Sequence, residues 1–251
     1  MKIAIVTGAT SGMGKEMVYH LADRISGLSE IWVVGRRKEI LESFIGNVPV
    51  RIRTFALDLT KKSDLAVLQT ALIERHPDVR ILVNAAGVGN TGKVGEISQD
   101  QTRNMIRLNM EALSMVTEMV LPYLSTGSRV IQFSSAAAFV PQPGFAVYAA
   151  TKSYVLSYSR ALAAELRQQG IFVTAVCPGT VHTEFLDLAL NGKKLPKYKQ
   201  MIMADPRKVV KTAVDDSLKG KDISVAGLPM QLFQFICKLV PHEWIMKMIS
   251  W

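Results

Sequence analysis

Tyr148 and Lys152 stand four residues apart in the chain, and Ser135 lies thirteen residues before Tyr148. On a helix, positions i and i+4 share one face, so the ammonium of Lys152 can lie near the phenol of Tyr148. A nearby positive charge favours the phenolate, and we therefore expect Lys152 to lower the pKa of Tyr148. Such a tyrosine could exchange a proton with a substrate oxygen near neutral pH, with the Ser135 hydroxyl directed at the same oxygen. The alternative is an exposed lysine that lies by chance beside a half-buried tyrosine.

The segments that would position these residues alternate between short apolar runs and longer helical patterns. The apolar runs are rich in β-branched residues and predict strands buried on both faces at 3–6, 31–34, 50–55, 81–83, 130–133 and 172–176, with a short edge strand near 223–225. Helices are predicted at 13–25, 37–45, 62–75, 101–124 and 146–168, and from Asp205 to about Leu218. Repeated strand–helix units predict an α/β fold: a single domain over residues 1–251, with a doubly wound parallel sheet of about seven strands and helices on both faces.

The composition is that of an ordinary globular protein with a basic surface. The 251 residues are 49% apolar and 20% charged, and the net charge is +9. The basic residues are dispersed and do not alternate with aromatic ones, so we expect an anionic cofactor and no nucleic-acid partner. Cys177 and Cys237 lack metal-like or redox-like neighbours and the four histidines are scattered, so we expect no disulfide framework and no metal site. The short apolar N-terminal run, and the lack of a stretch of about 20 apolar residues, predict a cytoplasmic protein.

A glycine-rich turn, Thr7-Gly8-Ala9-Thr10-Ser11-Gly12-Met13-Gly14, joins the first predicted strand to the first predicted helix. Gly8 would permit a tight turn, Gly12 would let the backbone approach a pyrophosphate, and Gly14 would allow the helix to pack closely on the strand. The free N–H groups at the start of the helix could then bind phosphate. We interpret the turn as a dinucleotide site, although its spacing differs from the common Gly-x-Gly-x-x-Gly; a turn without a ligand is the alternative.

The second predicted strand ends in Gly35-Arg36-Arg37-Lys38, where a site for NAD usually carries Asp or Glu for the ribose hydroxyl. Arginines at this place can instead bind a 2′-phosphate through paired hydrogen bonds. We therefore predict NADP(H) as the cofactor, with Arg36 and Arg37 beside its phosphate. The alternative is that these basic residues only begin a solvated helix.

Two further strand ends carry candidate cofactor contacts. Asp58 precedes Leu59 at the end of the third strand, where it could accept a hydrogen bond from an adenine amino group or cap the nearby helix. The segment Asn84-Ala85-Ala86-Gly87 ends the fourth strand. Its small residues would let the chain pass close to the cofactor, and Asn84 could stabilise the strand end.

Together these motifs resemble those of the short-chain dehydrogenase/reductase family, over nearly the whole chain. The resemblance rests on the order and intervals of the turn at 7–14, Asp58-Leu59, the segment 84–87, Asn109 within Leu108-Asn109-Met110-Glu111, Ser135, the Tyr148–Lys152 pair and Pro178-Gly179. It implies a Rossmann-like fold and an NADP(H)-dependent oxidoreductase that interconverts a ketone and a secondary alcohol. The implied cofactor contacts are Gly8, Thr10, Ser11, Gly12, Met13, Gly14, Arg36, Arg37, Asp58, Leu59, Asn84, Ala85, Ala86, Gly87, Tyr148, Lys152, Pro178, Gly179, Val181 and Thr183.

The resemblance also implies a role for each catalytic candidate. Tyr148 would be the general acid in carbonyl reduction and the general base in alcohol oxidation, and Lys152 would hold the nicotinamide ribose hydroxyls. Ser135 would orient the substrate oxygen; Ser134 is its neighbouring rival, but the thirteen-residue interval to Tyr148 favours Ser135. Asn109 would hold a water molecule that links Lys152 to solvent. The nicotinamide carboxamide would lie between Pro178, Gly179, Val181 and Thr183.

Residues 179–204 form a predicted substrate-specificity loop, because long irregular segments in compact domains are usually functional. Its apolar side chains suggest a hydrophobic pocket for a hydroxysteroid, a bile acid or an acyl or alkyl ketone: Phe185, Leu186, Leu188, Leu190, Met201 and Met203. The apolar C-terminal extension, residues 228–251, is expected to pack against the body or a partner subunit. A lid over the substrate and association with a membrane surface are the alternatives.

The expected partner is therefore a small apolar carbonyl or alcohol substrate. A non-catalytic NADP-binding regulatory protein on the same fold is the alternative function, although such a protein would not need the complete set Ser135, Tyr148, Lys152 and Asn109. The resemblance also implies a homodimer or homotetramer formed through the long helices at 101–124 and 146–168.

Overall fold

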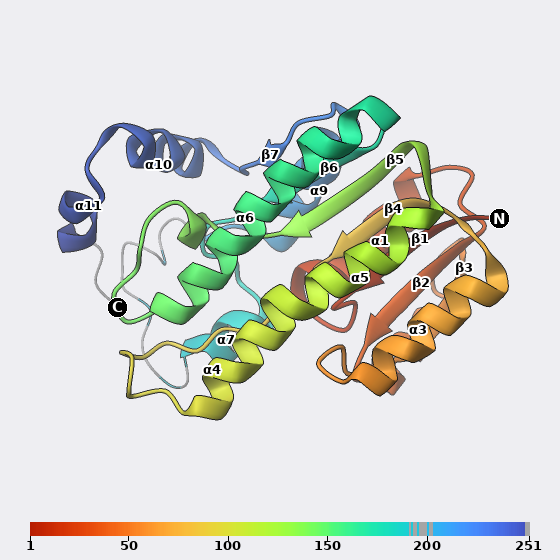
Figure 1. Cartoon of the computed structure of the whole chain (residues 1–251), viewed down its shortest axis with the longest axis horizontal. Coiled ribbons are helices and arrows are strands. Elements are labelled where there is room, and N and C mark those ends of the chain that lie inside the picture. The colour runs from red at the N-terminus through yellow and green to blue at the C-terminus, as the bar shows by residue number, and fades with distance from the viewer. Residues whose placement is uncertain (191, 193–194, 196–199, 201–202, 249–251) are drawn as a thin grey trace.

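The computed structural model describes residues 1–251 except 191, 193–194, 196–199, 201–202 and 249–251. Seven parallel strands form one sheet in the order β3-β2-β1-β4-β5-β6-β7 (Figure 1). Their bounds are Lys2–Thr7 (β1), Glu30–Gly35 (β2), Arg51–Ala56 (β3), Asp78–Asn84 (β4), Leu124–Phe133 (β5), Phe172–Val176 (β6) and Ile223–Ser224 (β7). The predicted doubly wound parallel sheet is confirmed, with β4 and β5 beginning earlier than the apolar runs indicated.

Helices cover both faces of the sheet (Figure 1). On one face lie α3 (Lys62–Arg75), α4 (Gln99–Ile106), α5 (Leu113–Val120) and α6 (Ala146–Leu166). On the other face lie α1 (Gly12–Arg24) and α9 (Pro206–Leu218), which pack against each other. The shorter elements are α2 (Lys38–Glu42), α7 (Glu184–Leu190) and the 3-10 turns η2 (Leu121–Tyr123), η3 (Ala136–Ala138) and η4 (Arg167–Gln169). Asp205 begins α9 as predicted, because its carboxylate accepts a hydrogen bond from the backbone N–H of Arg207 at 2.9 Å.

Alternate residues of each central strand enter the two layers of the core. On β1, Ile3 and Ile5 join the apolar cluster that includes residues of α3, α5 and α6, whereas Ala4 and Val6 join the cluster that includes residues of α1 and α9. All four side chains are fully buried. A strand covered on both faces has no solvated side, which explains why continuous apolar runs predicted these strands correctly.

The strand order reverses at β1, which pairs with β2 on one side and with β4 on the other. Because all strands are parallel, their carboxyl ends lie at one edge, and the chain leaves that edge in opposite directions from β1 and β4. A crevice forms at such a reversal, and this is where open α/β sheets bind ligands. Helices α7 and α10 (Leu228–Leu239) lie beyond the same edge (Figure 1).

Three segments differ from their predicted structure. The continuous helix predicted at 101–124 is interrupted between α4 and α5 by a π-helix, η1 (Arg107–Ala112). The loop at 179–204 contains α7, whose seven residues are too few to give a clear periodic signal. The extension at 228–251 contains α10 (Leu228–Leu239) and α11 (His242–Met248). Among the described helices, none is both long enough and apolar enough to cross a membrane.

Gly14→Ala should destabilise the protein, because a Cβ at this position would overlap the carbonyl oxygen of Gly8. A clash with backbone cannot be relieved by rotating a side chain, so we expect the free energy of unfolding to fall by about 3 kcal/mol and Tm by roughly 6–12 °C. Gly27→Ala is the control, since Gly27 has a φ of 81° but open space around an added Cβ. That variant should lose about 1 kcal/mol. Equal Tm shifts in thermal unfolding would contradict the packing role of Gly14.

Candidate active site

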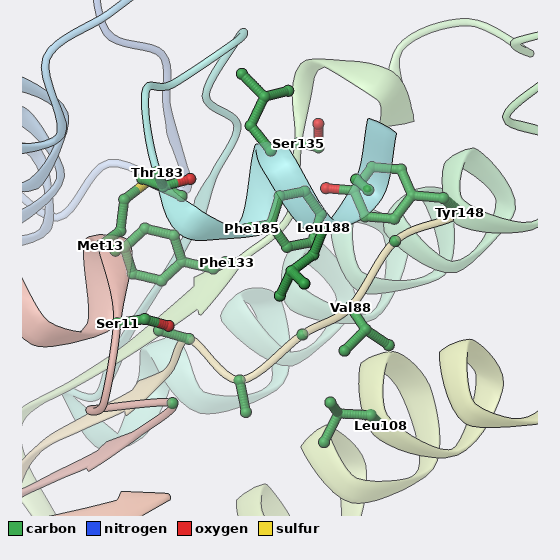
Figure 2. Close-up of a pocket in the computed structure, with 18 of the residues that line it drawn as sticks. Ser11, Met13, Val88, Leu108, Phe133, Ser135, Tyr148, Thr183, Phe185 and Leu188 are labelled. Atoms are coloured by element: carbon green, nitrogen blue, oxygen red, sulfur yellow. The ribbon is translucent and has the colours of Figure 1, made fainter. Parts of the chain in front are cut away.

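The predicted site residues converge on one cavity of about 640 Å³ at the carboxyl edge of the sheet. Segments that follow β1, β2, β3, β4, β5 and β6 line it, together with side chains of α6, α7 and α10. Figure 2 shows the two ends of the cavity, with Ser11 and Met13 at one end and Ser135 and Tyr148 at the other. The cavity therefore extends from the glycine-rich turn to Tyr148.

The turn after β1 forms one end of the cavity, which is lined by Gly8, Thr10, Ser11, Gly12, Met13 and Gly14. Gly8 has a φ of 68°, and a Cβ there would lie 2.6 Å from the backbone nitrogen of Ala86. Glycine is thus required for this turn to approach the end of β4. Ser11 is the N-cap of α1, yet its side chain makes no capping hydrogen bond. The first N–H groups of α1 are therefore available to an anion in the cavity.

The two arginines after β2 both line the cavity but have different surroundings. Arg36 is exposed, and the structure shows no ion pair or hydrogen bond between its side chain and any described residue. Arg37 donates hydrogen bonds to both carboxylate oxygens of Glu184, at 2.7 and 3.0 Å, and to the backbone oxygen of Thr10 at 2.9 Å. Arg37 thus lies where the sequence predicted it, but with a partner that the sequence did not indicate.

The end of β3 contributes Asp58 and Leu59 to the cavity lining. The Asp58 carboxylate accepts hydrogen bonds from the backbone N–H of Thr60 at 3.1 Å and from its hydroxyl at 2.7 Å. The carboxylate therefore orders the chain immediately after β3. The alternative cap on α3 is not formed, because the N-cap of α3 is Lys61.

The segment after β4 divides into cavity residues and a structural one. Ala85, Ala86 and Gly87 line the cavity, whereas Asn84 does not. The buried amide of Asn84 donates to the hydroxyl of Thr117 at 3.0 Å and accepts from the hydroxyl of Thr7 at 3.4 Å. These bonds fit the expected role of Asn84 in stabilising the strand end, because they join β4 to β1 and α5. The contact of Asn84 with the cofactor stays a prediction.

Ser135, Tyr148 and Lys152 come together at the other end of the cavity (Figure 2). Tyr148 and Lys152 project from successive turns of α6, and both are buried. Ser135 follows β5 and caps η3, where its oxygen accepts a backbone N–H at 3.1 Å; it also shares a hydrogen bond with the Tyr148 phenol. Ser134 instead donates its hydroxyl to the backbone oxygen of Lys152 at 2.7 Å. This geometry favours Ser135 as the serine that meets a substrate.

Burial controls the protonation of this pair. The Lys152 ammonium donates to the backbone oxygen of Phe133 at 2.8 Å and lies 5.7 Å from the centroid of the Tyr148 ring. Burial lowers the pKa of Lys152 to about 8 and raises the pKa of Tyr148 to about 12, with the hydrogen bond from Ser135 opposing the rise. The prediction that the pKa of Tyr148 is lowered is therefore wrong, because desolvation of the enclosed phenol dominates. Burial also raises the pKa of Cys177 to about 12, so this neighbour of Lys152 stays a neutral thiol.

Asn109 lies behind the catalytic candidates, outside the cavity lining. It is fully buried in η1, where its amide exchanges two hydrogen bonds of 2.9 Å with the backbone of Val88 and donates to the hydroxyl of Thr151 at 3.0 Å. These bonds join the segment after β4 to α6. A Cβ on Gly87 would lie 3.3 Å from both Asn109 and Lys152, so the two side chains are neighbours. The water-holding role of Asn109 stays a prediction.

The segment after β6 lines the cavity with all four of its predicted contacts: Pro178, Gly179, Val181 and Thr183. Thr183 lies against the glycine-rich turn, since a Cβ on Gly12 would be 3.2 Å from its side chain. Gly179 lies against Met230 of α10. The backbone oxygen of Pro178 accepts a hydrogen bond from Ala136 at 2.8 Å, which ties this segment to the one that carries Ser135.

The predicted specificity loop supplies Phe185, Leu186, Leu188 and Leu190 to the cavity, while Met201 lies outside the described residues. The Phe185 ring lies 5.6 Å from the Tyr148 ring between centroids. Figure 2 shows Phe185 and Leu188 beside the phenol. These contacts form an apolar surface directly against the tyrosine hydroxyl.

Other parts of this apolar surface were not indicated by the sequence. Phe145 stacks on Tyr148 with 4.3 Å between ring centroids, and Met230 and Phe233 of α10 complete the cavity wall. Met230 and Phe233 stand three residues apart on one face of α10, and this spacing was the signal available in the sequence. The sequence alone did not show what that face covers. The C-terminal extension therefore contributes to the cavity through α10.

The outer face of α10 carries a second set of apolar side chains. Leu228, Leu232, Phe235 and Leu239 follow one another at helical spacing and are exposed. Such an exposed apolar face fits association with a membrane surface and packing against a partner subunit, and both stay predictions.

The fold and the site together define an α/β oxidoreductase with its cavity at the switch point of the sheet. The chain matches the family model described as short chain dehydrogenase over residues 2–193. The chain therefore belongs to the short-chain dehydrogenase/reductase family, as the motifs indicated.

Curated relatives share about a third of their residues with this chain. An uncharacterized oxidoreductase of Staphylococcus epidermidis is 32% identical over 184 residues, which cover 72% of this chain and 79% of that protein. Sulfoacetaldehyde reductase 2 of Chromohalobacter salexigens is 33% identical over 196 residues, which cover 76% of this chain and 77% of that protein.

Solved structures share the fold at lower identity. A short-chain dehydrogenase from Sphingobium yanoikuyae in complex with NADPH superposes with a TM-score of 0.81 at 24% identity, covering 100% of this chain and 97% of the other. A family member from Burkholderia phymatum in complex with NAD gives a TM-score of 0.81 at 18% identity, covering 99% and 95%. These similarities establish the Rossmann-like arrangement over the length of the chain.

Proposed function

We propose that this protein is an NADP(H)-dependent oxidoreductase that interconverts a ketone and a secondary alcohol on an apolar substrate. The observation that carries the proposal is the convergence of Ser135, Tyr148 and Lys152 on a cavity that begins at the uncapped first turn of α1. A hydroxyl pair beside a buried cation suits a carbonyl oxygen that gains negative charge during reduction. A turn with free N–H groups suits the diphosphate of a dinucleotide.

The residues present fit a nicotinamide dinucleotide. Gly8 and Gly14 let the turn pack where a Cβ would overlap backbone atoms, and Thr183 lies against Gly12, so the backbone of this turn lines the cavity without side chains in the way. The bound cofactor would supply or accept the hydride. The similar structures include complexes with NADPH and with NAD, so the choice of NADP(H) rests on this chain's own Arg36, which is exposed at the cavity where a carboxylate would favour NAD.

Proton transfer is the task of the chain itself. Because burial raises its pKa to about 12, Tyr148 holds its proton at neutral pH, which is the form that carbonyl reduction requires. The Ser135 oxygen already accepts a backbone N–H of η3, which leaves its own proton to donate. The Lys152 ammonium, fixed by Phe133, stabilises negative charge that develops near the phenol. These roles favour reduction of a carbonyl at neutral pH.

An apolar substrate is supported by the wall opposite the phenol. Phe145, Phe185 and Leu188 lie around Tyr148, with Met230 and Phe233 of α10 further along the cavity. A lining of apolar side chains with a few polar groups suits an apolar ligand whose position those polar groups determine. A steroid, bile-acid or acyl ketone meets these requirements.

Tyr148→Phe should reduce NADPH-dependent turnover of a responsive ketone by at least about 100-fold, because it removes the proton donor while leaving the ring packed. A panel of steroid, bile-acid and acyl ketones would first identify the substrate by loss of NADPH absorbance. Tyr154→Phe is the matched control, since Tyr154 is a half-exposed tyrosine of α6 whose hydroxyl bonds to Ser114 at 2.9 Å. Unchanged turnover in Tyr148→Phe would contradict the mechanism. No NADPH-dependent turnover of any ketone by the wild type would favour the alternative, a non-catalytic NADP-binding regulatory protein.

Arg36→Asp should weaken NADPH binding at least about tenfold while changing NADH binding little, because only NADPH carries the 2′-phosphate. Dissociation constants from cofactor fluorescence would measure both. Lys38→Asp makes the same change of charge two residues further along, outside the cavity lining, and should leave both constants nearly unchanged. Equal losses for the two cofactors in Arg36→Asp would contradict the phosphate role.

Carbonyl reduction should lose rate as the pH rises through about 8. Below that pH both Lys152 and Tyr148 hold their protons, so the rate should be level. Above it Lys152 loses its charge while Tyr148 keeps its proton. The value of kcat/KM should then decrease with pH, and the decrease should approach about tenfold for each pH unit. Initial rates between about pH 6 and 10 would show the step. Lys152→Met should be slower throughout and lack it, and a level wild-type profile to pH 10 would contradict the assignment.

A further inference from the structure

Arg37 pairs with Glu184 at the cavity lining and so joins two segments that are far apart in the sequence. Arg37 follows β2, whereas Glu184 begins α7, and all three polar groups of this contact line the cavity: Arg37, Glu184 and Thr10. Both carboxylate oxygens accept hydrogen bonds from the guanidinium, at 2.7 and 3.0 Å. This is the two-pronged geometry by which arginine also holds a phosphate.

We propose that Glu184 is a specificity-determining residue that competes with the 2′-phosphate of the cofactor for Arg37. The inference rests on the proposed use of NADP(H). A carboxylate and a phosphate place the same demand on the guanidinium, so the two cannot both hold its paired donors. Glu184 therefore weakens binding of the phosphate, both by occupying Arg37 and by adding negative charge beside it.

The carboxylate is ionised whenever the competition matters. The hydrogen bonds from Arg37 hold the pKa of Glu184 below its usual value. Glu184 is therefore an anion throughout the neutral range, and its opposition to a second anion does not depend on moderate changes of pH.

The ion pair can exchange without loss of the surrounding structure. The side chains of Arg37 and Glu184 are 40% and 50% exposed, so water and a ligand reach them. The other end of α7 is held independently, because Thr91 donates both its backbone N–H and its hydroxyl to the backbone oxygen of Ala189 at 2.9 Å. Arg37 also keeps its hydrogen bond to the backbone oxygen of Thr10, which leaves the guanidinium beside the glycine-rich turn.

The two arginines therefore divide the recognition of the phosphate. Arg36, exposed and without a described partner, would contact it first, whereas Arg37 would join only by leaving Glu184. Preference for NADP(H) over NAD(H) is thus smaller than two adjacent arginines alone would give. Removing the carboxylate should increase that preference.

The test compares adenosine 2′,5′-bisphosphate with adenosine 5′-monophosphate, which differ only in the 2′-phosphate, by calorimetric titration of the full chain. Glu184→Gln should lower the Kd of the bisphosphate about three- to fivefold, the upper part of the range for exposed ion pairs, and leave that of the monophosphate within about twofold. In Arg37→Gln the same change at position 184 should have a much smaller effect, because only the repulsion between the carboxylate and the phosphate is then removed. Asp222→Asn is the control, because it breaks a similarly exposed ion pair with Arg167 away from the cavity.

The outcomes separate this inference from the proposed cofactor. An unchanged ratio of the two dissociation constants in Glu184→Gln, or an equal weakening of both ligands, would overturn the competition. If wild type prefers the bisphosphate in that case, the choice of NADP(H) stands without it. If wild type shows no preference but Glu184→Gln creates one, the competition stands and the NADP(H) preference of the wild type is lost.

Discussion

The seven strands are parallel, and the central ones are covered by helices on both faces, which decides where this protein can place polar chemistry. A side chain on either face of β1 enters an apolar cluster, so functional groups are confined to the strand ends. Because the strand order reverses at β1, the carboxyl ends open a crevice there. The glycine-rich turn, the arginines after β2 and Ser135 after β5 all reach one cavity for this reason.

The same burial determines the protonation of the catalytic candidates. The side chain of Lys152 projects from α6 into the interior and donates a hydrogen bond to the backbone oxygen of Phe133. The Ser134 hydroxyl donates a hydrogen bond to the backbone oxygen of Lys152. Burial raises the pKa of Tyr148 and lowers that of Lys152. Both groups keep their protons at neutral pH, but the pKa of Lys152 lies much closer to neutral than that of Tyr148. A site arranged in this way is prepared to donate a proton, and the lysine is the group whose charge changes first as the pH rises.

Two contacts connect the cofactor end of the cavity with the substrate end. Arg37 reaches Glu184 at the start of α7, and the next residue, Phe185, lies against the Tyr148 ring. Met230 of α10 lies against Gly179 after β6. Helices α7 and α10 therefore form the apolar wall while also contacting Arg37 and Gly179, two of the residues predicted to bind the cofactor. The proposed recognition of cofactor and of substrate thus shares these elements.

The sequence by itself determined the sheet, the order of its helices and the motif residues at the strand ends. Those features depend on local periodicity and on turn chemistry, which neighbouring residues carry. The tertiary structure decided what depends on distance through space: the pairing of residues 37 and 184, the π-helix that turns Asn109 towards Val88, and the part of α10 in the cavity wall. It also reversed the expected pKa shift of Tyr148, because spacing along a helix shows that a charge is near, whereas only the packed structure shows how completely water is excluded.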